Sequence, residues 1–253
     1  MQALLEQVLE IAYEAGDAIM DVYAKGFSVE LKDDNSPVTD ADQAAHEVIM
    51  RGLQSLSIQL PILSEEDAEG FTGVDDDGRY WLVDPLDGTK EFIKRNDEFT
   101  VNIALIENGR PVLGVVTAPA LKVAYIAAEG VGAFKIDATG QRQAIRVVGK
   151  PDKETIWRVM GSRSHPHPAL AAWLNKLGKH NVTPMGSSLK CCLIAEGKAD
   201  VYPRLGPTSL WDTAAAHAVI LQAGGRVESL EGEPLSYANP RETLNPSFVA
   251  WGH

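Results

Sequence analysis

The chain has 253 residues, 45% of them hydrophobic and 23% charged, a composition that suits one large globular domain. Its formal net charge of −12 repels the backbone of nucleic acids, so we expect no nucleic-acid polymer among its partners. No apolar run approaches the roughly 20 residues that span a bilayer, and the N-terminus lacks a signal-peptide pattern. The adjacent Cys191 and Cys192 are unsuited to pairing and fit no zinc spacing. These features predict a cytoplasmic protein without a transmembrane segment; peripheral attachment at the inner face of the cell membrane stays open, as does the oligomeric state.

Two amphipathic helices are predicted near the N-terminus. Apolar residues recur at helical spacing over residues 3–23 and again over residues 40–56. Thr39 is a favourable N-cap for the second helix, and Asp42, three residues later, completes a capping box. Between the helices, Lys32 to Pro37 has the composition of a turn-rich loop.

The rest of the chain mixes strand and helix patterns. Asn108-Gly109 predicts a hairpin turn between two strands. The expected strands cover residues 80–83, 99–106, 111–117, 123–127, 133–136, about 158–161 and 200–204, and the expected helices cover about 168–177, 189–196 and 211–223. This order predicts a layered α+β fold. We expect one domain over residues 1–253, with an N-terminal half to about residue 150 and a C-terminal half from about 151.

A short acidic turn carries the strongest chemical signal. Residues 84–89 read Asp-Pro-Leu-Asp-Gly-Thr and follow a hydrophobic strand. Such a turn can direct the carboxylates of Asp84 and Asp87, and the Leu86 carbonyl, into one cavity. Hard oxygen ligands at this density favour magnesium over zinc. Thr89 is expected to cap a following helix, whose N–H groups can bind phosphate. The alternative is an ordinary aspartate-rich surface turn.

Two other acids could join this turn. Glu65 follows the apolar stretch 60–63, and Asp212 falls in the first turn of a predicted hydrophobic helix. Each also has a simple structural explanation, because Glu65 could begin an exposed acidic loop and Asp212 could complement the helix dipole. The later acids, Asp67, Glu69 and residues 75–77, are expected to be solvated.

The order and spacing of these acids resemble the lithium-sensitive, magnesium-dependent inositol monophosphatase superfamily. The resemblance runs from the first helix to the C-terminus and implies an α-β-α-β-α sandwich with two or three Mg²⁺ ions. It implies metal ligands at Glu65, Asp84, the Leu86 carbonyl, Asp87 and Asp212. It also implies that Thr89 and Asp42 handle the attacking water.

Within the superfamily, several loops look like those of the bacterial 3'(2'),5'-bisphosphate nucleotidases. They are residues 35–39, 89–95, 162–165, 186–190 and 202–204. The substrate contacts that the resemblance implies are Glu65, Leu86, Asp87, Gly88, Thr89, His165, Ser187, Lys190, Arg204 and Asp212. Taken alone, His165 could be an ordinary loop histidine, Lys190 a surface lysine, and Arg204 the partner of a structural carboxylate.

The expected reaction is hydrolysis of the 3'-phosphate of adenosine 3',5'-bisphosphate to AMP and phosphate, with 3'-phosphoadenylyl sulfate as a further substrate, in support of sulfur assimilation. A metal held by Glu65 and Asp84 would lower the pKa of its water. A second metal would stabilise the leaving oxygen.

Three alternatives compete with this reaction. One is an inositol or other sugar monophosphatase, and another is a metal-dependent nucleotide sensor without turnover. A haloacid-dehalogenase-like phosphatase is disfavoured because the two acids of its motif are two residues apart, whereas Asp84 and Asp87 are three apart.

Overall fold

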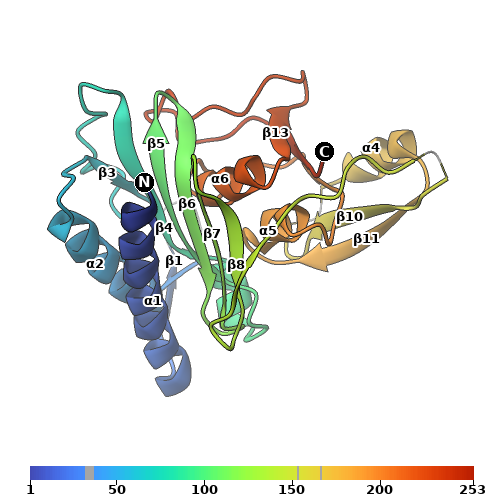
Figure 1. The fold of residues 1–253 in the computed structure, drawn as a ribbon. Helices are drawn as coiled ribbons and strands as arrows, with labels where there is room; N and C mark the ends of the chain where they lie inside the picture. The colour runs from blue at the N-terminus through green and yellow to red at the C-terminus, as the bar shows by residue number, and fades with distance from the viewer. Residues whose placement is uncertain (32–36, 153, 166) are drawn as a thin grey trace.

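The computed structural model of the protein describes residues 1–31, 37–152, 154–165 and 167–253 (Figure 1). Its helices are α1 (Gln2–Lys25), α2 (Asp40–Ser55), α3 (Thr89–Ile93), α4 (Leu170–Leu177), α5 (Leu189–Ala195) and α6 (Ala214–Gln222). Its strands are β1 (Val29–Leu31), β2 (Pro37–Thr39), β3 (Ile62–Ser64), β4 (Arg79–Asp87), β5 (Thr100–Glu107), β6 (Arg110–Ala118), β7 (Val123–Ala128), β8 (Gly132–Ile136), β9 (Arg142–Ala144), β10 (Trp157–Ser162), β11 (His180–Met185), β12 (Val201–Arg204), β13 (Arg226–Ser229) and β14 (Phe248–Trp251).

A seven-stranded sheet forms the centre of the N-terminal half. Its strands lie in chain order from β3 to β9, and every neighbouring pair is antiparallel except β3 and β4. The predicted hairpin turn between β5 and β6 is confirmed. Asn108 has a φ of 49° and Gly109 a φ of 76°, the positive values that a two-residue type I′ turn requires.

Helices α1 and α2 cover one face of this sheet (Figure 1). Their predicted apolar faces are buried in a core shared with the sheet; in α1 the buried residues include Leu5, Val8, Ala12, Ala15 and Ile19. The predicted capping box at the start of α2 is confirmed, with the Thr39 and Asp42 side chains each receiving a backbone N–H.

Helices α5 and α6 lie between the two sheets (Figure 1). Helix α6 is apolar on all sides, which suits an element buried on both sides. It packs so closely on β6 that a Cβ atom at Gly114 would overlap the carbonyl oxygen of Ala215. The close contact fixes the start of α6, and with it Asp212, against the seven-stranded sheet.

The second sheet has five strands in the order β11-β10-β12-β14-β13. Strands β11, β10 and β12 are parallel, and β14 and β13 are antiparallel to their neighbours. Helix α4 packs on the outer face with Trp157 and Trp251. The layers therefore run helix, sheet, helix, sheet, helix, which confirms the predicted α+β sandwich. Across the described residues, no helix is both long and apolar enough to cross a membrane.

Two local predictions are wrong. Thr89 is the first residue of α3 rather than its cap, because Gly88 occupies the N-cap position in the left-handed region with a φ of 98°. Helix α6 begins at Ala214, so Asp212 precedes it; the Asp212 carboxylate accepts the backbone N–H of Ser209 in a turn before the helix.

Other differences are omissions. Strand β11 was not predicted, because it is a largely exposed edge strand that contains Pro184, and such strands lack the alternating pattern. The short strands β1, β2, β3, β9, β13 and β14 were also missed. In the predicted loop from Lys32 to Pro37, residues 32–36 fall outside the described residues. The division of the chain into halves near residue 150 stays a prediction.

Candidate active site

A cavity of about 200 Å³, open to solvent, is lined by residues from both halves of the chain. The N-terminal half contributes the end of β4 and the start of α3, and the C-terminal half contributes segments around β10, α5, β12 and the turn before α6. Most of the predicted site residues line it: Glu65, Asp84, Leu86, Asp87, Gly88, Thr89, His165, Ser187, Lys190, Arg204 and Asp212.

The acidic turn at the end of β4 is shaped by the backbone. The register between β4 and β5 shifts between Asp84 and Asp87, so the strand leaves regular pairing at this point. The Leu86 N–H donates to Asp84 Oδ1 over 3.1 Å, which fixes the orientation of that carboxylate. At Gly88, a Cβ atom would lie 3.1 Å from the Glu98 carbonyl oxygen. Glycine is therefore required by both its positive φ and its close packing.

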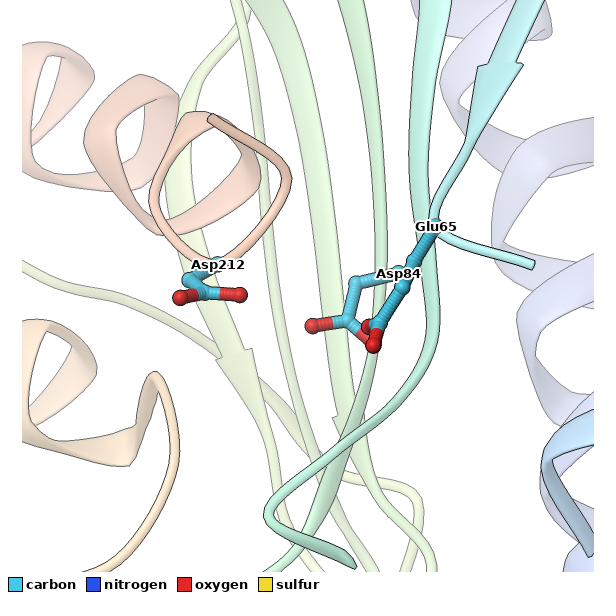
Figure 2. Close-up of side chains that lie close together, drawn as sticks. All are labelled: Glu65, Asp84 and Asp212. Carbon is cyan, nitrogen blue, oxygen red and sulfur yellow. The ribbon is translucent and has the colours of Figure 1, made fainter. Parts of the chain in front are cut away.

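Three carboxylates from distant parts of the chain meet in the cavity. Oxygens of Glu65, Asp84 and Asp212 all lie within 4.8 Å of one another. Figure 2 shows Asp212, from the turn before α6, facing the other two across the cavity. Glu65 is held beside β4 because its N–H donates to the Val83 carbonyl over 3.1 Å. The structure thus brings together acids that the sequence separates by up to 147 positions (from 65 to 212).

The carboxylates raise one another's pKa. Burial raises the pKa of Asp84 well above its usual value, and the negative charges of Glu65, Asp87 and Asp212 raise it further. The pKa of Asp212 is raised well above its usual value by burial, Asp87 and Glu65. Such a cluster is stable in its charged form only with cations nearby. The oxygen-only donor set fits a hard divalent cation.

Asp87 lies beside a cation of the protein itself. Burial raises the pKa of Asp87, whereas the positive charge of Lys190 lowers it. Lys190 is only 7% exposed and its ammonium donates to the Ser187 carbonyl. Burial lowers the pKa of Lys190, and Asp87 counteracts this effect. The alternative reading of Lys190 as a surface lysine is therefore wrong.

Asp42 and Thr89 are adjacent although 47 positions separate them. Asp42 Oδ2 accepts the Thr39 N–H over 2.8 Å, as the capping box requires, and it also accepts the Thr39 hydroxyl over 2.7 Å. The other oxygen, Oδ1, accepts the Thr89 hydroxyl over 3.3 Å. The helix cap therefore holds the carboxylate that Thr89 contacts, so the structural and the functional explanation of Asp42 are compatible.

The remaining predicted residues line the same cavity. The ring of His165 is 2.8 Å from the ammonium of Lys90, measured at Nε2. Arg204 donates to the Pro207 carbonyl over 2.7 Å, and within the described part of the chain no carboxylate pairs with it. The structural ion pair considered for Arg204 is thus absent there. Ser187 has a φ of 45°, unusual for a non-glycine residue.

Lys90 and Glu91 also line the cavity, although their sequence pattern predicts no role for either side chain. Glu91 is 3% exposed and accepts the Ser164 hydroxyl. Both residues directly follow Thr89 and belong to residues 89–95, a loop that resembles those of the bacterial bisphosphate nucleotidases. That position could have indicated a place in the site.

Comparison with known proteins places this geometry in a family. The sequence matches the inositol monophosphatase family over residues 1–251. The chain belongs to that family. Enzymes of the family are metal-dependent, and the acidic cluster of Glu65, Asp84 and Asp212 is a site where a metal fits.

Relatives and solved structures extend over almost the whole chain. The 3'(2'),5'-bisphosphate nucleotidase CysQ of Escherichia coli K12 is 55% identical over 249 residues, which cover 97% of this chain and 98% of that protein. The CysQ crystal structure from Bacteroides thetaiotaomicron has a TM-score of 0.83 at 38% identity and covers 99% of this chain and 97% of its own. An inositol monophosphatase structure from Anabaena has a TM-score of 0.77 at 26% identity, covering 99% of this chain and 91% of its own.

Proposed function

We propose that this chain is a magnesium-dependent 3'(2'),5'-bisphosphate nucleotidase. It hydrolyses the 3'-phosphate of adenosine 3',5'-bisphosphate to AMP and phosphate, and acts on 3'-phosphoadenylyl sulfate in support of sulfur assimilation. The observation that carries the proposal is a partly buried carboxylate cluster that lines one cavity together with basic residues. Full-length similarity to the bisphosphate nucleotidase CysQ supports the choice of substrate.

Two or three Mg²⁺ ions would be held by Glu65, Asp84, the Leu86 carbonyl, Asp87 and Asp212. These groups present only oxygen atoms, which suits magnesium, and the elevated pKa values of Asp84 and Asp212 indicate carboxylates that need a cation. When bound, magnesium activates water for attack on phosphorus and stabilises the oxygen that leaves.

Asp42 and Thr89 would orient the attacking water. When the Thr89 hydroxyl donates its proton to Asp42 Oδ1 rather than to the Leu86 carbonyl oxygen, which lies 3.4 Å away, its oxygen lone pairs are available to accept a hydrogen bond from water. The Thr89 hydroxyl can then pass the proton of the attacking water to Asp42. Asp42 is only 3% exposed, so bulk water competes little with this exchange.

The rest of the substrate would extend away from the carboxylates. The N–H groups of Gly88 and Thr89 would contact the reacting phosphate, and His165, Ser187, Lys190 and Arg204 the remaining nucleotide. Lys190 is close enough to Asp87 to affect its pKa, so this lysine also offsets negative charge at the metal end. Both cysteines are buried free thiols, compatible with the cytoplasmic location that the sequence predicts.

The test is phosphate release from adenosine 3',5'-bisphosphate, inositol 1-phosphate and fructose 1,6-bisphosphate, measured side by side with and without magnesium. The proposal predicts the highest kcat/KM for the nucleotide and no turnover without a divalent cation. A preference for inositol 1-phosphate would establish the sugar monophosphatase alternative. Tight nucleotide binding without turnover would establish the sensor.

A further inference from the structure

The cavity is lined by both acidic and basic side chains. Glu65, Asp84 and Asp212 form the acidic cluster. Elsewhere in its lining, the pKa of His165 is lowered first by burial and then by the positive charges of Lys90, Arg204 and Lys190, with Glu91 acting in the opposite direction. Three cations are thus within electrostatic reach of one imidazole, and all of them line the cavity.

Lys90 is the cation in direct contact with that imidazole. Its Nζ lies 2.8 Å from His165 Nε2. An ammonium group can only donate, so Nε2 accepts, and the neutral ring carries its proton on Nδ1. Within the described part of the chain, no carboxylate lies within ion-pair distance of Lys90, whereas Arg163 and Lys135 pair with Glu98 and Glu196 over 2.7 Å each.

The side chain of Arg204 independently indicates that an anion binds beside His165. Its Nη2 donates to the Pro207 carbonyl over 2.7 Å, but its Nε is buried and has no hydrogen-bond partner among the described residues. A buried donor without a partner is costly, and such groups are uncommon unless a ligand satisfies them. A basic region that has an unsatisfied donor, and in which no carboxylate of residues 1–31, 37–152, 154–165 or 167–253 pairs with Lys90 or Arg204, suits a phosphate group.

We propose that Lys90, together with His165, binds the second phosphate of a nucleotide bisphosphate and so determines the preference for bisphosphates over monophosphates. This inference rests on the proposed function. The reacting phosphate must lie at the acidic cluster, where metal ions neutralise the carboxylates. The second phosphate would be repelled by those carboxylates and attracted by Lys90 and Arg204.

The chain connects the two phosphate positions directly. Lys90 follows Thr89 in α3, and Thr89 contacts Asp42, whose negative charge acts on Asp84. One short turn therefore sets the spacing between the group that handles water and the group that would hold the second phosphate. An inositol monophosphate has no second phosphate for Lys90 to contact, so the residue would contribute little to its turnover.

The test compares Lys90→Met with Lys94→Met. Lys94 is the matched control because it lies one helical turn later, donates to the Ser164 hydroxyl over 3.1 Å beside His165, and is not a cavity residue. Methionine keeps the apolar stem and removes the charge. Activity is measured on adenosine 3',5'-bisphosphate and on adenosine 3'-monophosphate, with magnesium present.

Lys90→Met should lower kcat/KM for the bisphosphate by about 10- to 100-fold, mainly through KM, with a loss at least five times smaller on the monophosphate. Lys94→Met should change both substrates equally and by less than about threefold, as expected for a screened surface charge. Equal losses on both substrates in Lys90→Met, or the same selective loss in Lys94→Met, would overturn the assignment.

A binding measurement separates this inference from the proposed function. Calorimetry with 5'-AMP and with adenosine tests recognition of the 5'-phosphate without any turnover. Lys90→Met should weaken 5'-AMP binding by about tenfold and leave adenosine binding within twofold. An unchanged affinity for 5'-AMP would refute the role of Lys90, even if the wild-type protein proved to be a nucleotidase. The predicted loss would uphold it even if turnover were absent.

Discussion

Replacing Asp84 by asparagine keeps the shape of the side chain but removes one negative charge from the carboxylate cluster. Asp84 is 1% exposed, and oxygens of Glu65 and Asp212 lie within 4.8 Å. At 4.8 Å and an effective dielectric constant of about 20, two unit charges repel by roughly 3.5 kcal/mol. When no metal is bound, the substitution therefore removes the repulsion between residue 84 and the other two carboxylates. When magnesium is present, it removes a negative charge that would bind the metal.

Stability and activity should consequently change in opposite directions. The pKa of Asp84 is raised on folding. The folded protein therefore keeps the proton of the Asp84 carboxyl group to a higher pH than the unfolded chain does. Above the usual pKa of a carboxyl, the group therefore makes the metal-free folded state less stable. Asp84→Asn removes this penalty, so the metal-free variant should unfold at a higher temperature than the metal-free wild type. Its magnesium-dependent kcat should fall by about 10³-fold or more.

The expected increase in Tm on magnesium binding can also be calculated. A ligand present at about 100 times its Kd stabilises the folded state by about 2.7 kcal/mol, which for a chain of this size raises Tm by roughly 5–10 °C. The wild-type protein should show this increase, and Asp84→Asn should lose most of it.

The assay combines phosphate release over a magnesium titration with thermal unfolding with and without magnesium. Asp76→Asn is the control, because Asp76 is exposed and lies outside the cavity. Near-normal kcat in Asp84→Asn at saturating magnesium would refute the assignment of the metal site. An undiminished increase in Tm with magnesium would refute it equally.

Four further predictions address other parts of the molecule. Millimolar lithium should inhibit uncompetitively or with a mixed pattern, and sodium should not; insensitivity would count against lithium sensitivity in this chain. Thr89→Val should lower kcat by about 10²-fold or more with little change in KM, because the valine cannot accept from water or donate to Asp42; a loss confined to KM would exclude that role. Lys190→Ala and Arg204→Ala should each lower kcat/KM for adenosine 3',5'-bisphosphate by about 10- to 100-fold, and Arg204→Ala should affect inositol 1-phosphate less; equal losses would make Arg204 structural. Burial lowers the pKa of His217 to about 3, so the unfolded chain binds a proton below pH 6.5 that the folded state excludes, and stability should fall with decreasing pH. His217→Gln should flatten the dependence of Tm on pH between about 6.5 and 4; an unchanged slope would assign acid sensitivity elsewhere.

Local patterns in the sequence determined most of the elements. The apolar periodicity of α1 and α2, the Asn108-Gly109 turn and the Thr39–Asp42 capping box depend on neighbours within a few positions, and each was predicted correctly. The start of α6 was misplaced because residues with helical composition, Trp211 to Thr213, are held instead in a turn by Asp212 and Ser209. Strand β11 was missed because an exposed edge strand lacks the pattern of burial.

The acidic turn at residues 84–89 was recognisable because its ligands are close together in the sequence. The contact between Asp42 and Thr89, the approach of Asp212 to Asp84 and the pairing of Lys90 with His165 join residues separated by at least 47 positions. No local propensity encodes such contacts. These contacts form because α6 packs against β6 at Gly114 and because segments from both sheets line one cavity. The sequence by itself therefore determined which chemical groups are present, whereas tertiary structure decided which carboxylates share a cation and which basic residues face them, because charge interactions depend on distance in space.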